Sequence, residues 1–429
     1  MLNKGAAEKR FGYHPYCQGL KLTHLSFADG KRQSIEGIIN IFNHFVEMSG
    51  LHISVEKTTI FLAGVQDTEK QELLDTFAFA HGDLPVIYLG LPLLTKQMTV
   101  RNYAHLIEKI RARIGSWTAR FLSFAGRLQL IGSVIHSLTN FWISAFKLPR
   151  KCIQEIDSLC AAFLWSGADM NTNKAKVSWK DYCRPKEEGG LGLRSLEEAN
   201  QVSCLKLVWR ILSSKNSLWV KWVRRYLIRK GSFWTVKDSS SLGSWMWKKL
   251  FKYREVAAVF SKMKVKNGMS TSFWFDDCCY SNPKHKRRRH RVEVFNLIEL
   301  EILKVKHRGL QSEEDIRLWK CGDDYKLSFT TKETWKLLRG MQARVDWFEG
   351  VWFRYSTPRF SFHTWVAILD RLPTGDRISL WNGGIAVMCP LCKDCPETRN
   401  HLFFQCKYSG GADDPHQKAF EDGLYQCVG

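Results

Sequence analysis

The chain has 429 residues, 45% of them hydrophobic and 13% aromatic, so it can form several folded domains and is not a disordered protein. Its 64 Lys and Arg residues against 42 Asp and Glu residues give a formal net charge of +22, which is typical of proteins that bind a polyanion. Nucleic acid is the first candidate partner and an anionic membrane surface is the second. The sequence contains no run of about 18 apolar residues and no apolar leader, so we expect an intracellular protein that does not span a membrane.

The first part of the chain combines helical and extended patterns. Apolar residues at helical spacing predict a helix over residues 34–48 that stops at Gly50. The following stretch, 51–63, is β-like, and a polar helix is expected over 68–79. The apolar stretch 84–94 is short and contains prolines, so we expect an extended connector.

Residues 100–146 have a helical pattern with a break at Gly115. Nearly every charge on the polar side of this pattern is positive, and the cations are Arg101, Lys109, Arg111, Arg113, Arg120 and Arg127. This arrangement is typical of a solvated helix face, but a face of one sign equally suits contact with phosphates. We take Arg111, Arg113, Arg120 and Arg127 as candidate nucleic-acid contacts.

The middle of the chain continues with helical patterns at 152–165 and 197–212. The glycine-rich stretch 188–192 could suggest a phosphate cradle. No apolar strand precedes it and no Lys-Ser or Lys-Thr follows it, so it is interpreted as a turn into the second helix. Tryptophan is dense between 209 and 247, where packing in a core explains it more simply than stacking on bases.

A basic run at 284–291 marks an exposed linker and the most natural domain boundary. Its residues Lys286, Arg287, Arg288 and Arg289 are candidate nucleic-acid contacts or a nuclear-import signal, although such runs are more often simply solvated. Just before it, Asp276 and Asp277 look like the paired carboxylates of a polymerase turn. Their flanks lack the apolar strands that would hold them on a metal pair, so we do not assign them a catalytic role.

Beyond the basic run, helices are expected over 329–338, with Thr330 or Thr331 as cap, and within 352–368. A turn at 371–377 and a further apolar segment at 378–381 follow. The tail after Ser409 contains Gly, Asp and Pro and is expected to be disordered.

A spacing of Cys-x2-Cys-x8-His-x4-Cys occurs near the end of the chain, formed by Cys389, Cys392, His401 and Cys406. The first pair can bind one ion from a tight turn, and the second pair can complete a tetrahedron from one helical face. All four positions would be protein ligands, which predicts structural Zn²⁺ rather than a catalytic ion with an open position. Cys395 lies close enough in sequence to replace one ligand, and a chain with thirteen cysteines can also contain such a spacing by chance.

The segment from about Phe329 to Tyr408 resembles the zinc-binding domain at the C-terminus of plant non-LTR (LINE-type) retroelement reverse transcriptases. The matching residues are Trp352-Phe, Trp365, Arg371-Leu-Pro-Thr-x-Asp-Arg377, Trp381, Cys389, Cys392 and His401-Leu-Phe-Phe-x-Cys406. Further upstream, the thumb and connector of that family are matched by Tyr88-Leu-Gly-Leu-Pro92, Trp117, Leu122-Ser-x-Ala-Gly-Arg127, Phe163-Leu-Trp165, Gly189-Gly-Leu-Gly-Leu193 and Thr271-Ser-Phe-Trp274. The resemblance covers about residues 20–408.

The resemblance fails at the polymerase centre. Such reverse transcriptases need three carboxylates for two metal ions, two of them in a Phe/Tyr-Ala-Asp-Asp turn. Here Phe27-Ala-Asp29 is followed by Gly30, so Asp29 is the remnant of that turn and no catalytic set is intact. The fingers, the first palm carboxylate and the endonuclease domain are also expected to be missing.

The resemblance therefore implies a mainly α protein with an α+β remnant at the N-terminus. Its expected parts are a truncated palm remnant (1–99), a helical thumb-like region (100–190), a Trp-rich connector with the basic linker (191–291), the zinc-binding domain (292–409) and a disordered tail (410–429). We expect a nuclear protein that binds RNA, DNA or their hybrid, is not bound to a membrane and has no polymerase activity. The alternatives are an RNA-directed DNA polymerase completed in trans by a separate palm, and a host-recruited factor whose zinc module binds a protein as yet unknown.

Overall fold

The computed structural model describes residues 32–52, 59–62, 66–77, 80–82, 85–94, 96–117, 122–171, 177–214, 216–229, 231–237, 243–269, 293–297, 300, 312–381 and 387–408. These residues are mostly helical, which confirms the mainly α fold class. They form two compact units, each built from two separate stretches of chain. The first unit combines Met1–Gln97 with Leu205–Phe329, and the second combines Met98–Cys204 with Thr330–Gly429. The division into five parts stays a prediction.

The N-terminal stretch of the first unit contains α3 (Arg32–Ser49), β1 (Thr59–Ile60), α4 (Asp67–Thr76), β2 (Ala80–His81), β3 (Ile87–Tyr88) and β4 (Leu91–Pro92). Helix α3 confirms the predicted helix, and Gly50 follows it with a φ of +67° that favours glycine. β1 and β2 pair in parallel. The expected connector is a hairpin of β3 and β4, because Leu89 and Gly90 both have positive φ and reverse the chain.

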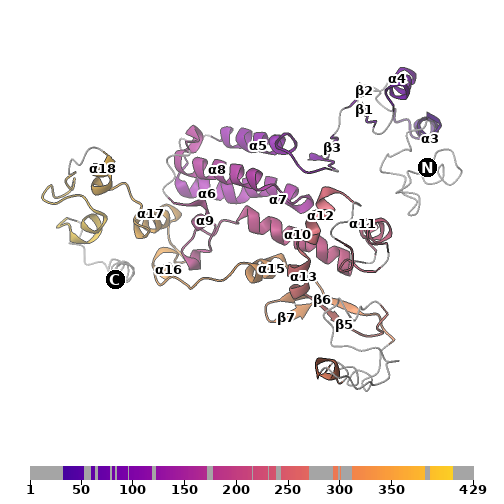
Figure 1. Cartoon of the computed structure of the whole chain (residues 1–429). Helices are drawn as coiled ribbons and strands as arrows, with labels where there is room; N and C mark the ends of the chain where they lie inside the picture. Colours follow the sequence, from indigo (N-terminus) through magenta and orange to yellow (C-terminus); the bar gives the residue numbers. More distant parts are fainter. Residues whose placement is uncertain are drawn as a thin grey trace. The chain divides into compact units, whose positions relative to one another are not determined.

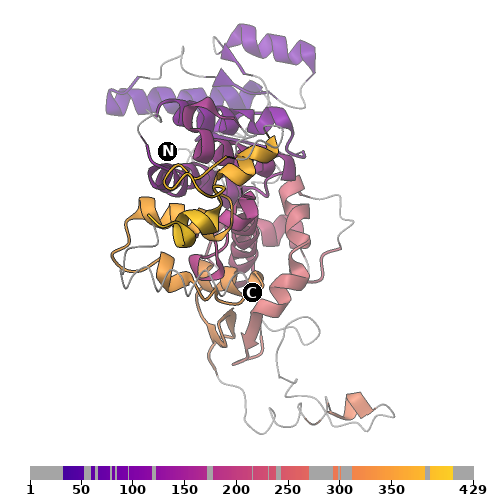
Figure 2. The same cartoon turned by 90° about the vertical axis from the view of Figure 1, so that its left-hand side faces the viewer.

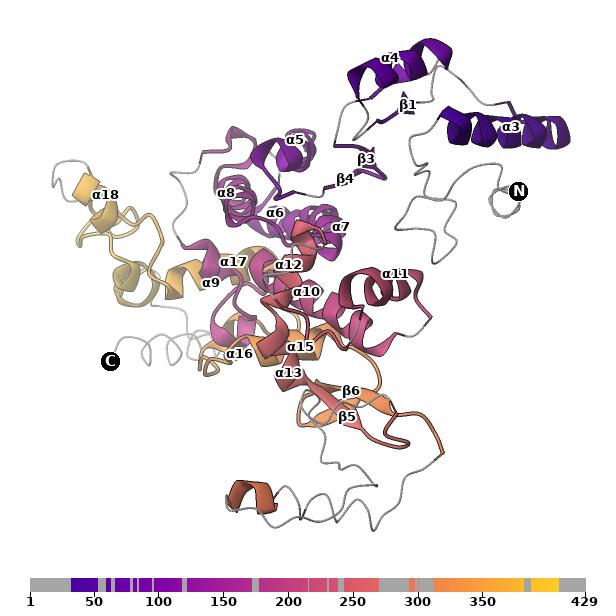
Figure 3. The same cartoon turned by 45° about the vertical axis from the view of Figure 1, so that its right-hand side comes forward.

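The rest of the first unit contains part of α10 (Leu196–Ser213), then α11 (Leu218–Trp222), the π-helical η7 (Val223–Ile228), α12 (Trp245–Phe251), α13 (Arg254–Phe260) and an antiparallel sheet of β5 (Ser261–Lys264), β6 (Ile316–Cys321) and β7 (Asp324–Lys326). Figure 3 shows β5 and β6 next to α13. Trp319 is fully buried, and its ring contacts those of Trp209, Phe260 and Phe329. Trp209 and Trp247 are also buried, which supports the packing role expected for these tryptophans.

The first stretch of the second unit is a group of packed helices: α5 (Val100–Gly115), α6 (Phe124–Leu130), the π-helical η3 (Ile131–Ile135), α7 (His136–Ala145) and α8 (Arg150–Ser166). α5 lies beside α8 in Figure 1, and it ends at Gly115 as the sequence predicts. The interior is largely aliphatic, since Ile110, Ile131 and Ile135 are fully buried, and Phe163 of α8 is fully buried as well. Burial of these side chains is the main stabilising term for such a cluster.

Helix α10 is fixed to this group by one buried side chain. Asn200 accepts a hydrogen bond from the backbone of Leu148 (2.8 Å) and donates to the carbonyls of Ile143 (3.2 Å) and Phe146 (2.7 Å). The amide therefore satisfies backbone groups left unpaired where α7 ends. The short elements η4 (Gly167–Asp169), α9 (Trp179–Tyr182) and η6 (Lys186–Glu188) connect α8 to α10.

The C-terminal stretch of the second unit contains α15 (Thr331–Leu338), α16 (Phe348–Val351), α17 (Pro358–Ile368), α18 (Gly375–Trp381) and the π-helical η8 (His401–Gln405). α15 confirms the predicted helix, with Thr330 at its N-cap position. Within this unit α17 packs on α6. In the view of Figure 2 the orange and yellow C-terminal segments are seen in front of the purple helices, whereas Figure 1 shows α18 farther from them than α17. Among the described helices, none is long and apolar enough to cross a membrane.

Candidate metal centre

A tight loop carries Cys389 and Cys392. The backbone N–H of Cys389 donates to the carbonyl of Cys395 (2.8 Å), and the N–H of Lys393 donates back to the carbonyl of Cys389 (2.9 Å). Lys393 adopts a φ of +61°, which lets the chain reverse directly after Cys392. Met388 and Pro396 form a β-bridge at the base of the loop. The loop thus holds both thiols on its inner side.

His401 and Cys406 lie at the two ends of a π-helical turn. The N–H of Cys406 donates to the carbonyl of His401 (2.8 Å), a bond between residues five apart. In an α-helix with 3.6 residues per turn, residues five apart point in different directions, whereas the wider π turn brings them closer together. The spacing predicted two ligands on one helical face, and the π turn is the geometry that brings residues five apart together.

The four predicted side chains come together. Their ligand atoms all lie within 4.8 Å of one another. Sγ of Cys389 is 4.0 Å from Sγ of Cys406, and Sγ of Cys392 is 3.2 Å from Nε2 of His401. A tetrahedral Zn²⁺ with ordinary bond lengths separates its ligands by about 3.8 Å for two sulfurs and about 3.6 Å for sulfur and nitrogen. The cluster therefore matches the size of a zinc site closely.

The burial of the cluster indicates a structural site. Cys389, His401 and Cys406 are buried, and Cys392 is half-buried. Cys395 is exposed and is not part of the group, although it is close in sequence. A buried set of three thiols and one imidazole is a typical donor set for structural zinc, and it leaves no position for a catalytic water.

The loop backbone favours thiolate at Cys392. The pKa of this thiol is lowered to about 6, first because the N–H of Asp394 donates to it and further through the N–H of Cys395 and the side chain of His401. Burial raises the pKa of Cys389, and the N–H groups of Leu391 and Cys392 oppose that effect. Since metal ions bind the thiolate, these backbone donors prepare the loop for a cation.

With this geometry in place, comparison with known proteins identifies the segment. Residues 329–411 match the family described as zinc-binding in reverse transcriptase. This segment is a reverse-transcriptase zinc-binding domain. A protein of Arabidopsis thaliana named "Putative ribonuclease H protein" is 32% identical over 164 residues, which are 36% of this chain and 26% of that protein. An "Uncharacterized mitochondrial protein" of the same plant is 26% identical over 141 residues, 33% of this chain and 91% of that protein.

These matches confirm the resemblance to plant retroelement reverse transcriptases and support a reverse-transcriptase-related protein. The chain spans about a quarter of the length of the first relative. The zinc-binding domain starts at Phe329, where the aromatic core of the first unit ends, and it contains α15, α16, α17, α18 and η8.

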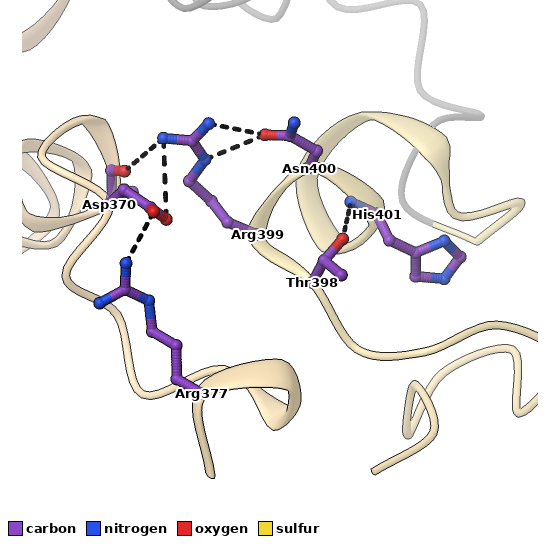
Figure 4. Close-up of polar contacts among 7 residues, drawn as sticks. Asp370, Arg377, Thr398, Arg399, Asn400 and His401 are labelled. Atoms are coloured by element: carbon purple, nitrogen blue, oxygen red, sulfur yellow. Dashed lines mark hydrogen bonds and ion pairs between the residues drawn. The ribbon is translucent and has the colours of Figure 1, made fainter. Parts of the chain in front are cut away.

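A half-buried arginine, Arg399, connects the ligand turn of the zinc-binding domain to α17. Figure 4 shows Arg399 between Asn400 and Asp370. Arg399 donates to Oδ1 of Asn400 through Nε (3.0 Å) and Nη2 (2.8 Å), and Nη1 reaches the carbonyl of Ala367 at the end of α17 (3.4 Å). Arg377 binds the other side of Asp370 at 2.7 Å. Arg399 was not predicted, because no pattern in the sequence distinguishes it from other arginines.

The imidazole of His401 points away from this arginine network (Figure 4). Its backbone N–H donates to Oγ1 of Thr398 at 3.1 Å, so the ligand turn is capped at the residue that carries the ligand. The arginine network and the cap together fix where the imidazole projects.

The glycine-rich loop predicted as a turn is also a support for the zinc-binding domain. Nε1 of Trp365 donates to the carbonyl of Gly189 (2.8 Å), and Glu188 forms a half-buried ion pair with Arg339. Gly190 leaves no room for a side chain, since an added Cβ would lie 2.1 Å from the carbonyl oxygen of Arg184. The residues around 188–190 thus contact side chains from distant positions of the same unit, which agrees with the predicted turn.

An aromatic cluster completes this support. Phe124 of α6 stacks on Phe362 of α17 with centroids 4.9 Å apart, and Trp165 donates to the hydroxyl of Tyr182 (2.6 Å) beside Trp365. These contacts bring the sequence-matched Leu122–Arg127, Phe163–Trp165 and Gly189–Leu193 motifs against the zinc-binding domain within one unit.

The candidate nucleic-acid residues differ in exposure. Arg111 and Arg113 are exposed on α5, where Arg111 forms an ion pair with Glu155 at 3.2 Å. Arg127 is half-buried and donates to the carbonyl of Leu164 (3.2 Å), and burial lowers its pKa. Arg127 therefore has a structural contact at the end of α8, and phosphate binding by it stays a prediction. The candidates Asp29, Arg120, Lys286, Arg287, Arg288 and Arg289 lie outside the described residues.

Proposed function

We propose that this chain is a fragment of a non-LTR (LINE-type) retroelement reverse transcriptase that binds nucleic acid and uses Zn²⁺ to stabilise its C-terminal domain. The observation that carries the proposal is the buried Cys3His cluster inside a segment that matches the zinc-binding family. Cys389, Cys392, His401 and Cys406 hold the ion. Bound there, zinc supplies folding energy and no reaction chemistry.

The nucleic-acid surface that we propose is the exposed side of α5. Arg101, Lys109 and Arg113 are exposed there, and none of them pairs with a carboxylate among the residues that the structure describes. Unpaired cations on a rigid helix are suited to the phosphates of an RNA–DNA hybrid, and they bind without reading sequence. The net charge of +22 supports the same partner. We also propose nuclear localisation, for which the basic run at 284–291 is the support.

The proposed function does not include polymerase activity, because Asp29 is followed by Gly30. A two-metal site needs carboxylates on both sides of the ion pair, and Gly30 stands where the second aspartate of the turn belongs. The related chemistry named for a relative, ribonuclease H, is not proposed for this chain.

The test is the salt dependence of binding to an RNA–DNA hybrid. For Lys109→Gln combined with Arg113→Gln, we expect the slope of log K against log salt to fall by roughly one to two units, because two phosphate contacts are lost. Arg111→Gln is the matched control on the same helix, since its guanidinium is already paired with Glu155. A double variant with the slope of the parent would show that α5 is only a solvated face.

A further inference from the structure

An exposed stretch of alternating aromatic and basic residues precedes α17. Phe353, Tyr355 and Phe360 are 52%, 82% and 67% exposed, which is unusual for large aromatic side chains. Arg354 and Arg359 lie between them in sequence and are exposed as well. We call these five residues the aromatic–arginine surface. They lie within the zinc-binding domain but contact neither the zinc ligands nor the glycine-rich loop in any described interaction.

The aromatic–arginine surface has no acidic neighbour in sequence. Residues 350–369 contain no Asp or Glu. The carboxylates at the two ends of this stretch are both neutralised, because Glu349 pairs with Arg344 and Asp370 pairs with Arg377. Among the described residues, Arg354 and Arg359 form no ion pair with a carboxylate. The guanidinium of Arg354 lies over the ring of Tyr355, 5.5 Å from its centroid, and the charge of this surface is positive and not neutralised by a described carboxylate.

The backbone presents this surface on a firm base. The N–H of Ser356 donates to the carbonyl of Phe353 (3.0 Å) and closes a turn, and Pro358 starts α17 at a position where proline fits. The opposite side of α17 buries Phe362 and Trp365 in the aromatic cluster. Phe360 is thus fixed through α17, and the turn closed by Ser356 defines the backbone that carries Phe353 and Tyr355, so a partner that stacks on these rings does not have to order the backbone first.

We propose that the aromatic–arginine surface binds single-stranded nucleic acid, with bases stacked on Tyr355 and Phe360 and with Arg354 and Arg359 on the phosphates. This deepens the proposed function, on which it rests. Flat exposed rings suit every base, and interleaved cations suit the backbone of the strand. The absence of acidic groups over residues 350–369 favours this partner over a basic protein segment. RNA and DNA share this chemistry, and the experiment separates them.

The experiment uses the full zinc-loaded chain and fluorescence anisotropy with labelled oligo-dT, oligo-rU and an RNA–DNA hybrid, each of about 12 units. Tyr355→Ala with Phe360→Ala should weaken single-strand binding on the order of tenfold or more, since each stacked base contributes roughly 1–3 kcal/mol. The salt slope and hybrid binding should stay unchanged. Phe141→Ala is the control, because Phe141 of α7 is also exposed, at 47%. Greater loss with oligo-rU than with oligo-dT would assign the surface to RNA, and the reverse to DNA.

Two further double variants test separately the charges and the flat rings of the aromatic–arginine surface. Arg354→Gln with Arg359→Gln should lower the single-strand salt slope by about one to two units. Tyr355→Leu with Phe360→Leu keeps the apolar area and removes the flat rings, so binding should fall as in the alanine variant. Leucine variants that bind single strands like the parent would overturn stacking on flat rings.

The failures of the two proposals can be told apart. Suppose that the alanine variant binds single strands as tightly as the parent, while the salt slope of hybrid binding falls in the α5 double variant. Single-strand binding by the aromatic–arginine surface is then refuted, and the proposed function stands. If the parent binds neither single strands nor hybrid at low salt, both are refuted.

Discussion

Cys392 and Cys395 are three positions apart in one loop, yet they have different environments. Cys392 accepts backbone N–H donors and lies 3.2 Å from His401, whereas Cys395 is exposed and contributes its carbonyl to the loop. A metal site is formed by the side chains that the backbone directs inward, not by every cysteine nearby.

We expect Cys392→Ser to lose the zinc ion and to lower the thermal stability of the C-terminal domain. Serine is a poor zinc ligand at neutral pH, and the binding energy of a structural ion is folding energy. Cys395→Ser is the matched control and should keep about one zinc per chain. The measurement is metal content together with a thermal melt. Full zinc occupancy in Cys392→Ser would refute the ligand set. If zinc were also lost in Cys395→Ser, Cys395 would be the ligand in place of Cys392.

At the scale of elements, the loop around Gly189 and Gly190 connects segments that are far apart in sequence. The carbonyl of Gly189 receives the indole of Trp365, and the loop places Glu188 next to Arg339. Gly190 packs against the backbone of Arg184, so this contact depends on a residue without a side chain. The loop is therefore a structural joint between η6 and α17.

Gly190→Ala should destabilise the second unit by on the order of 2 kcal/mol or more, because the added Cβ meets backbone that cannot move aside cheaply. Gly126→Ala is the control. A Cβ added at Gly126 would lie 3.5 Å from its nearest neighbouring atom, which is ordinary van der Waals contact. Gly126 lies in helix α6, and alanine is favoured over glycine in a helix by roughly 1 kcal/mol. The measurement is the apparent unfolding midpoint in denaturant. Equal effects of the two changes would show that the close approach at Gly190 is not needed.

Periodicity predicted the long helices α3, α5, α8 and α10 because their apolar residues recur at helical spacing, and α5 buries its stripe through Leu106, Ile110 and Ile114. Spacing predicted the four clustered ligand residues because short loops limit how far they can separate. The π turn at His401–Gln405 and the Arg399 network were not predictable, since one depends on an extra residue per turn and the other on a contact with α17. The support formed by Gly189 was missed for the same reason: its partner, Trp365, is 176 residues away.

At the scale of the whole molecule, the chain should synthesise no DNA on a primed RNA template with Mg²⁺ or Mn²⁺. Asp29 is followed by Gly30, so the pair of adjacent carboxylates that a two-metal site requires is not encoded at this turn. Primer extension measures this directly, and Asp29→Ala is the control. Template-dependent incorporation that disappears in Asp29→Ala would refute the loss of chemistry, whereas incorporation unchanged by that substitution would indicate a contaminating polymerase.

The second unit is built from two stretches of chain, and this affects its synthesis on the ribosome. Phe124, Trp165 and Tyr182 are made early, but Phe362 and Trp365, which pack on them, follow only after the intervening stretch Leu205–Phe329. At about 5–20 residues per second, roughly ten to forty seconds pass before the partners emerge. During that interval the aromatic side chains of the nascent chain are exposed to solvent without their partners. Exposed apolar surface of this kind favours aggregation, so we expect chaperones to bind the nascent chain.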